Sequence, residues 1–194
     1  MTPRDAAANA RLSPNQLDKR RQIVEAARAV LARDGLTGCT ARAVADASPL
    51  TKSAIHYYFA DMDDLVDLAM AGHITAFVAN LREAADGHEK PVDRFWAAVD
   101  DYLQTFREMP GSAQLWFEYW IDATRKGRLD PIERMHRQVI AIFAELLQAV
   151  PVDAPAQRAQ TLFSYLLGTV VRQAVEPSPP DVIRAEISAI CALD

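Results

Sequence analysis

The sequence predicts an all-α protein of about nine helices, with a three-helix helix-turn-helix head followed by a larger helical domain. Half of the 194 residues are hydrophobic and only seven are glycine, a balance that favours helix over sheet. Apolar residues recur at helical spacing along most of the chain, and no segment alternates like a half-buried strand. Two short capped helices follow a longer one near the start, which is the order of elements in a helix-turn-helix.

The first predicted helix follows a polar, proline-containing segment over residues 1–18, which we expect to form a flexible N-terminal arm. The helix runs from about Lys19 to Asp34, and its apolar residues follow the i, i+3, i+4, i+7 spacing of an amphipathic helix. Gly35 supplies a C-terminal cap.

Two threonines define the next two helices. Thr40 is a favourable N-cap for a helix over residues 41–47, and Thr51 caps a third helix that ends near Tyr58. Within this third helix Ile55 and Phe59 share one face, which we expect to be buried. The other faces carry a lysine, small polar residues and aromatic rings, a set that suits phosphates and base edges.

Three runs mark the head region, which are Thr40-x-Arg42-x-Val44-Ala45, Leu50-Thr51-Lys52-Ser53-x-Ile55-x-Tyr57-Tyr58-Phe59, and Asp61-x-Asp63-x-Leu65. Their residues and spacing resemble the N-terminal signature of the TetR family of bacterial transcriptional regulators. The resemblance covers about a quarter of the chain, roughly residues 19–68. The family has glycine more often at Pro49, tyrosine at His56, and at Met62 a lysine that contacts phosphate.

The resemblance implies a homodimer that binds a palindromic double-stranded DNA operator, and a small-molecule effector that moves the two heads apart and releases the DNA. Arg42 and Lys52 are then the candidates for contact with base edges, while His56 and Tyr57 serve the DNA backbone. The full set of expected DNA-binding residues is Thr40, Arg42, Thr51, Lys52, Ser53, Ala54, His56, Tyr57 and Tyr58. The competing interpretation is that Tyr58 packs inside the head, or that Arg42 is exposed to solvent without contacting DNA.

Charge is distributed unevenly along the chain. Residues 19–60 carry seven Lys and Arg against three Asp and Glu, whereas residues 61–194 carry twelve against twenty-one. A basic segment attached to an acidic body is typical of a polyanion-binding module joined to another function. We therefore expect a DNA-binding domain over residues 19–64 and an effector-binding and dimerisation domain over residues 65–194.

Six further helices are expected in the larger domain. Asp61 caps one that continues to about residue 85, and Pro91 opens the next. Asp130 and Glu133 form a predicted capping box for a later helix. The remaining helices are expected around residues 115–126, from Pro155, and after Ser178-Pro-Pro-Asp181.

An aromatic cluster marks this larger domain and predicts an apolar effector pocket. Rings arranged around Glu118 would suit an organic cation. The candidate pocket residues are Trp96, Trp116, Glu118, Tyr119, Trp120 and Phe143. The alternative is that these rings simply fill the core, and the sequence does not identify the effector.

The last two helices are apolar over wide faces, which suits a four-helix dimer interface. The expected interface residues are Leu162, Phe163, Leu166, Leu167, Val170, Ile183, Ile187 and Ile190.

The sequence does not predict an enzyme. The four histidines lack metal-binding spacing, and there is no glycine-rich phosphate loop and no nucleophile motif. Neither Cys39 nor Cys191 belongs to a zinc quartet, and a buried Cys39 is a better reading than a redox sensor. We expect no catalytic residue, cofactor or metal. The alternatives are a dimeric interaction module that does not bind DNA and, less favoured, a small-molecule enzyme.

The location of the protein follows from two further observations. No apolar run is long enough for a membrane span, and the first residues lack the apolar stretch of a secretory signal. We expect a cytoplasmic protein with no membrane partner.

Overall fold

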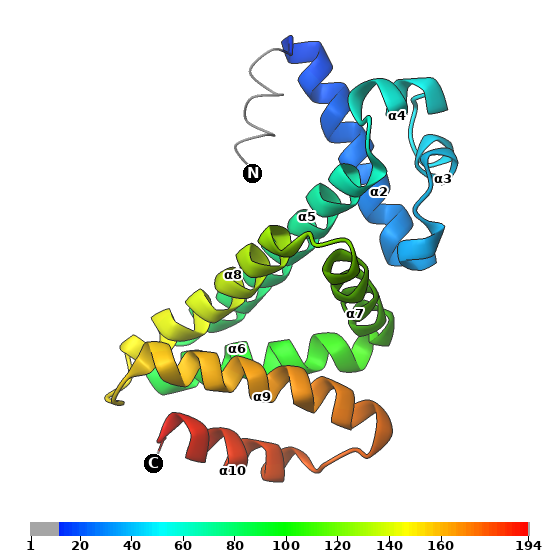
Figure 1. Ribbon diagram of the computed structural model, residues 1–194. Helices are drawn as coiled ribbons and strands as arrows, with labels where there is room; N and C mark the ends of the chain where they lie inside the picture. Colours follow the sequence, from blue (N-terminus) through cyan, green and yellow to red (C-terminus); the bar gives the residue numbers. More distant parts are fainter. Residues whose placement is uncertain (1–11, 194) are drawn as a thin grey trace. The chain divides into compact units, whose positions relative to one another are not determined.

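The computed structural model describes residues 12–193, and this part of the chain contains nine α-helices and no strand (Figure 1). The predicted all-α class is confirmed. Residues 1–11 of the expected N-terminal arm lie outside the described residues. The helices are α2 (Pro14–Gly38), α3 (Ala41–Asp46), α4 (Lys52–Tyr58), α5 (Met62–Asp86), α6 (Pro91–Glu108), α7 (Pro110–Arg125), α8 (Leu129–Gln148), α9 (Pro155–Val175) and α10 (Pro180–Cys191).

Helix α2 begins earlier than the sequence analysis expects. Ser13 and Gln16 form a capping box, and Pro14 occupies the first helical position, where its missing N–H costs nothing. The predicted start at Lys19 is therefore wrong, since the capping residue Ser13 lies six residues before it.

Gly35 interrupts α2 as predicted. Its φ of 72° and ψ of −172° lie in a backbone region that is essentially restricted to glycine. The chain turns at this point and reaches Thr40, the N-cap of α3.

The described chain divides into two compact units. Among the described residues, the first comprises residues 12–73 and 114–127, and the second comprises residues 74–113 and 128–193. The first unit therefore contains α2, α3, α4, the start of α5 and most of α7. Helix α7, which the sequence analysis places in the larger domain, belongs by its contacts to the unit that contains the head.

The first unit is built on the buried stripe of α2. Helix α3 packs against both α2 and α4, and Ile23, Val30, Val44 and Ile55 have no exposed surface. Both short helices are thus fixed by their apolar sides, and their opposite sides face outward.

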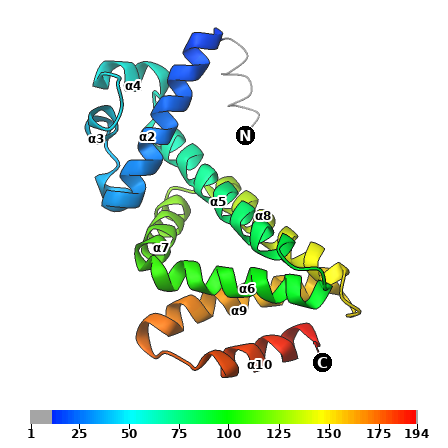
Figure 2. The same ribbon diagram turned by 180° about the vertical axis from the view of Figure 1, so that it is seen from behind.

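The second unit has its core around α9, which packs against α6, α8 and α10 (Figure 2). Phe95, Tyr102 and Phe143 are fully enclosed and stack edge-on or tilted against one another. At the start of α8 the predicted Asp130–Glu133 capping box does not form. The helix begins at Leu129, and its N-cap Arg128 makes no side-chain capping bond.

Candidate nucleic-acid interface

Two threonine caps hold the helix-turn-helix in place. The Thr40 Oγ1 accepts a hydrogen bond from the Ala43 N–H at 3.2 Å, and the Thr51 Oγ1 accepts one from the Ala54 N–H at 3.3 Å. Both predicted caps are confirmed. Each threonine hydroxyl still has its own hydrogen, so a capping threonine at this surface remains a donor for an anion.

Helix α4 separates buried from exposed residues as its spacing predicts. Ile55 is fully buried, and Phe59 just beyond the helix is nearly so. The outward side chains of α4 lie on the opposite faces. Lys52, Ser53, His56 and Tyr57 are exposed, and Ala54 and Tyr58 are half-buried.

Arg42 projects from the neighbouring helix α3 with 85% of its side chain exposed. Asp46, one turn further along α3, lies 4.0 Å from the Arg42 Nε and is also exposed. A surface ion pair of this kind is weak, so it leaves the guanidinium available to another anion. Arg42 and Lys52 thus present cationic donors from two successive helices that pack against each other.

Tyr57 is the most exposed aromatic residue of this surface, at 70%. Its ring meets Tyr58 edge-on at a centroid distance of 5.0 Å. Its hydroxyl oxygen accepts a hydrogen bond from the Gln16 Nε2 at 3.4 Å. Sequence reasoning missed Gln16, because it lies 41 residues away on α2.

Arg20 contacts the residue at the C-terminal end of α4. Its guanidinium lies 4.7 Å from the centroid of the Phe59 ring, within the range of a cation–π contact. Arg20 thus joins α2 to the residue that ends α4.

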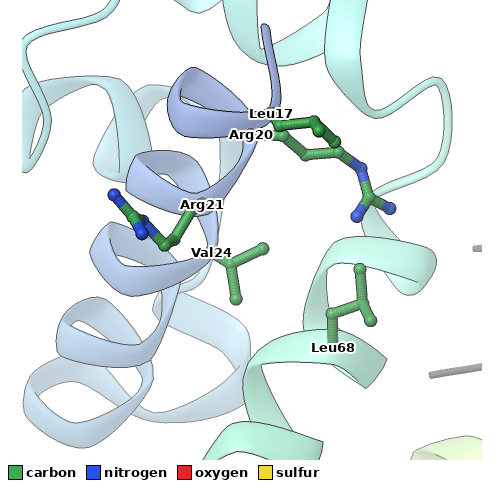
Figure 3. A pocket seen from close by; sticks show the side chains of 5 residues that line it. All are labelled: Leu17, Arg20, Arg21, Val24 and Leu68. Atoms are coloured by element: carbon green, nitrogen blue, oxygen red, sulfur yellow. The ribbon is translucent and has the colours of Figure 1, made fainter. Parts of the chain in front are cut away.

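A small pocket of about 220 Å³ lies in the first unit (Figure 3). Leu17, Arg20, Arg21 and Val24 of α2 line it together with Leu68 of α5, and Figure 3 shows Arg21 extending to the opposite side of α2 from Leu68. None of the six candidate effector residues lines this pocket.

The candidate effector residues are divided between the two units. Trp116 and Tyr119 are buried in the first unit, where the Tyr119 hydroxyl donates to the Asp67 Oδ1 at 2.9 Å. Glu118 accepts a hydrogen bond from Gln114 at 2.8 Å, and Trp120 is 43% exposed.

Trp96 and Phe143 belong to the second unit. The Arg184 guanidinium lies 3.9 Å from the centroid of the Trp96 ring, so one cation already covers this ring. Phe143 packs on Phe95 and Tyr102 within the core. Both rings contribute to the packing of a single chain.

The residues expected at a dimer interface fall into two groups. Five are buried inside the single chain: Leu162, Phe163, Leu166, Ile183 and Ile187. The other three, Leu167, Val170 and Ile190, are only partly buried. Leu162, Leu166 and Ile187 have no exposed surface, and Phe163 and Ile183 have almost none, so these five pack in the core of the single chain.

Burial also determines the chemistry of two titratable residues. Burial raises the pKa of the Cys39 thiol to about 11, so at neutral pH the thiolate that a redox sensor requires is absent. Burial lowers the pKa of His136, whose ring meets Phe163 edge-on at 5.2 Å. Within residues 12–193 no cluster of His, Cys, Asp or Glu could hold a metal ion.

Two short helices, each capped by threonine and braced by α2, carry an exposed set of donors on one unit of an all-α chain. This arrangement is that of a helix-turn-helix DNA-binding regulator. Residues 23–69 match the model for bacterial regulatory proteins of the tetR family, and residues 86–193 match the model for the tetracyclin repressor-like C-terminal domain. The chain belongs to the TetR family.

Curated relatives agree with this assignment. The chain is 30% identical to the nicotine-responsive transcriptional repressor HdnoR of Paenarthrobacter nicotinovorans, over 75% of this chain and 74% of that protein. It is 25% identical to the transcriptional regulator PksA of Bacillus subtilis, over 93% of this chain and 95% of that protein. Both relatives are regulators rather than enzymes.

Solved structures share the fold at low sequence identity. A transcriptional regulator from Streptomyces coelicolor superimposes with a TM-score of 0.74 at 18% identity, covering 89% of this chain and 98% of that one. The multidrug binding protein EbrR in complex with proflavin superimposes with a TM-score of 0.67 at 19% identity, covering 88% of this chain and 98% of that one.

Among residues 12–193, every helix is too short or too polar to cross a membrane.

Proposed function

We propose that the protein is a repressor that binds a palindromic DNA operator as a homodimer in the cytoplasm and leaves it when a small organic effector binds. The observation that carries this proposal is the outward surface of α3 and α4, where Arg42, Lys52, Ser53, His56 and Tyr57 are all exposed. A buried core does not use cations, and an ordinary solvated face does not use exposed rings. A surface that binds a DNA duplex can use both.

The roles of these residues follow from their chemistry. Arg42 and Lys52 reach base edges in the major groove, where guanine offers two acceptors to a cationic donor. Ser53 and Ala54 are small enough to allow a close approach. Thr40, Thr51, His56, Tyr57 and Tyr58 donate to phosphates along the DNA backbone.

Dimerisation is proposed to use the outer faces of α9 and α10. Val171 and Val175 on α9 and Val182 on α10 are exposed, and Leu167 and Val170 continue the stripe on α9. The wide apolar faces of these helices thus serve two purposes, one side filling the core and the other meeting a second copy. A two-fold dimer would give two heads for two half-sites about one helical turn of DNA apart.

The effector is proposed to bind in the TetR C-terminal-like domain and to favour the conformation released from DNA, because a ligand shifts only an equilibrium in which its affinities differ. HdnoR is nicotine-responsive and EbrR has been solved with proflavin, so small heterocyclic molecules are the first candidates. All three tryptophans of the chain lie within residues 86–193, which match this domain. Quenching of tryptophan fluorescence by nicotine or proflavin, with loss of DNA binding, would support this assignment.

Selection from a pool of random DNA duplexes tests the DNA-binding proposal directly. We expect enrichment of a palindromic sequence, and fluorescence anisotropy should show that affinity falls steeply between about 50 and 200 mM salt as phosphate contacts release counterions. Failure to enrich any sequence, with the protein folded and dimeric, would favour an interaction module that does not bind DNA. The protein is proposed to have no catalytic activity.

A further inference from the structure

Gln16 has two separate partners, one on each atom of its carboxamide. The Gln16 Oε1 accepts a hydrogen bond from the Ser13 N–H at 2.9 Å and completes the cap of α2. The Gln16 Nε2 donates to the Tyr57 Oη at 3.4 Å. One side chain therefore closes the start of α2 and contacts the exposed face of α4.

This contact determines which way the tyrosine hydroxyl can donate. The Tyr57 oxygen acts as the acceptor, because a carboxamide nitrogen has hydrogens but no lone pair to offer. The hydroxyl hydrogen then points away from Gln16, and among the described residues no side chain or carbonyl accepts it. The edge-on contact with Tyr58 restrains the ring as well.

We propose that Gln16 is a positioning residue for DNA binding, which holds the Tyr57 hydroxyl so that its free hydrogen donates to a phosphodiester oxygen of the operator. The inference rests on the proposed function and adds to it a residue outside the helix-turn-helix. Tyr57 touches the DNA, and Gln16 acts through Tyr57.

The choice of glutamine over glutamate supports this reading. Both residues complete a capping box, and the positive end of a helix favours glutamate. A carboxylate at this position would accept from Tyr57, turn the hydroxyl hydrogen inward, and place a negative charge beside the DNA. Glutamine keeps the cap and leaves the hydrogen directed outward.

The test compares variants of the full-length protein on the operator selected with the wild type. Gln16→Ala should weaken binding roughly threefold to tenfold, the effect of losing one ordinary hydrogen bond. In a Tyr57→Phe background the same substitution should have little further effect, because the hydroxyl it positions is gone. Gln16→Glu should weaken binding more than Gln16→Ala, and part of that difference should disappear at higher salt.

Ser13→Ala is the matched control, since it removes the side-chain half of the α2 cap and leaves the Gln16–Tyr57 contact. It should lower the melting temperature and change operator affinity less than twofold. Equal losses of affinity in Ser13→Ala and Gln16→Ala would assign the effect to the cap and overturn the inference, as would additive effects of Gln16→Ala and Tyr57→Phe. If the wild type selects no operator, the proposed function fails together with the inference. If it does and the variants behave additively, only the inference fails.

Discussion

At the scale of single residues, Lys52 is where the proposed DNA-binding role is most directly tested. Its side chain is exposed on α4 directly after the Thr51 cap. We expect Lys52→Ala to weaken operator binding by about 1–3 kcal/mol, the range for loss of a base contact. Anisotropy titration at matched salt measures this.

Lys90→Ala provides the control for the lost charge, because Lys90 is also exposed but lies in the second unit. Equal weakening by the two substitutions would show that net charge matters and that Lys52 makes no base contact.

Two half-buried histidines are expected to make the free energy of unfolding depend on pH. Desolvation lowers the pKa of His73, helped by the nearby Arg28 charge, and desolvation lowers the pKa of His136. In the folded state both therefore stay neutral at pH values where the unfolded chain takes up protons. The unfolded state binds more protons below its ordinary histidine pKa of 6.5, so the free energy of unfolding should fall as the pH drops from about 7.5 to about 5.5.

Urea unfolding at several pH values measures this slope. The double variant His73→Gln, His136→Gln should have a flatter slope, whereas His88→Gln at an exposed position should not change it. A wild-type slope that survives the double substitution would show that other groups titrate.

At the scale of elements, α7 and the residue that follows it contact the start of α5 through two polar groups that differ in burial. Tyr119 is fully buried and its hydroxyl donates to the Asp67 Oδ1. Lys126 is partly exposed and bridges Asp63 at 2.8 Å and Asp122 at 3.0 Å.

Burial determines which contact matters more. We expect Tyr119→Phe to lower the free energy of unfolding by about 1–3 kcal/mol, because it removes the buried hydroxyl that donates to the half-buried Asp67 carboxylate. Lys126→Ala should cost no more than about 1 kcal/mol, as for a solvent-screened pair. Chemical denaturation of the two variants compares them, and the reverse order would contradict this ranking.

The elements also show what local sequence does and does not reveal. Threonine caps, the break at Gly35 and the buried face of α4 are encoded within a few residues, and all were predictable. The start of α2 was predictable in principle from Ser13 and Gln16, whereas the Asp130–Glu133 pattern looked like a cap and forms none. Asp130 lies inside α8, and a capping motif indicates a helix start only where the capping residue itself takes a non-helical conformation.

At the scale of the whole molecule, the proposed dimer should depend on the outer stripe of α9. Val175 is 82% exposed in the single chain. We expect Val175→Glu to weaken dimerisation at least roughly tenfold, because a charge would have to be desolvated in an apolar interface. Sedimentation equilibrium measures the change, and affinity for a full operator should fall with it.

Leu129→Glu is the control on α8, an exposed apolar residue outside this stripe. An unchanged dimer in Val175→Glu, or an equal loss in both variants, would place the interface elsewhere.

The sequence by itself determined the helical class, the helix-turn-helix and the outward side chains of α4, because helical periodicity and capping depend on neighbours three or four residues apart. It left open what each apolar face packs against. Only the tertiary structure decided that Leu162, Leu166 and Ile187 are core residues and that α7 belongs with the unit that contains the head. The contact of Gln16 with Tyr57 was likewise decided by packing. It joins residues 41 positions apart, and such pairs depend on how helices pack rather than on any local pattern.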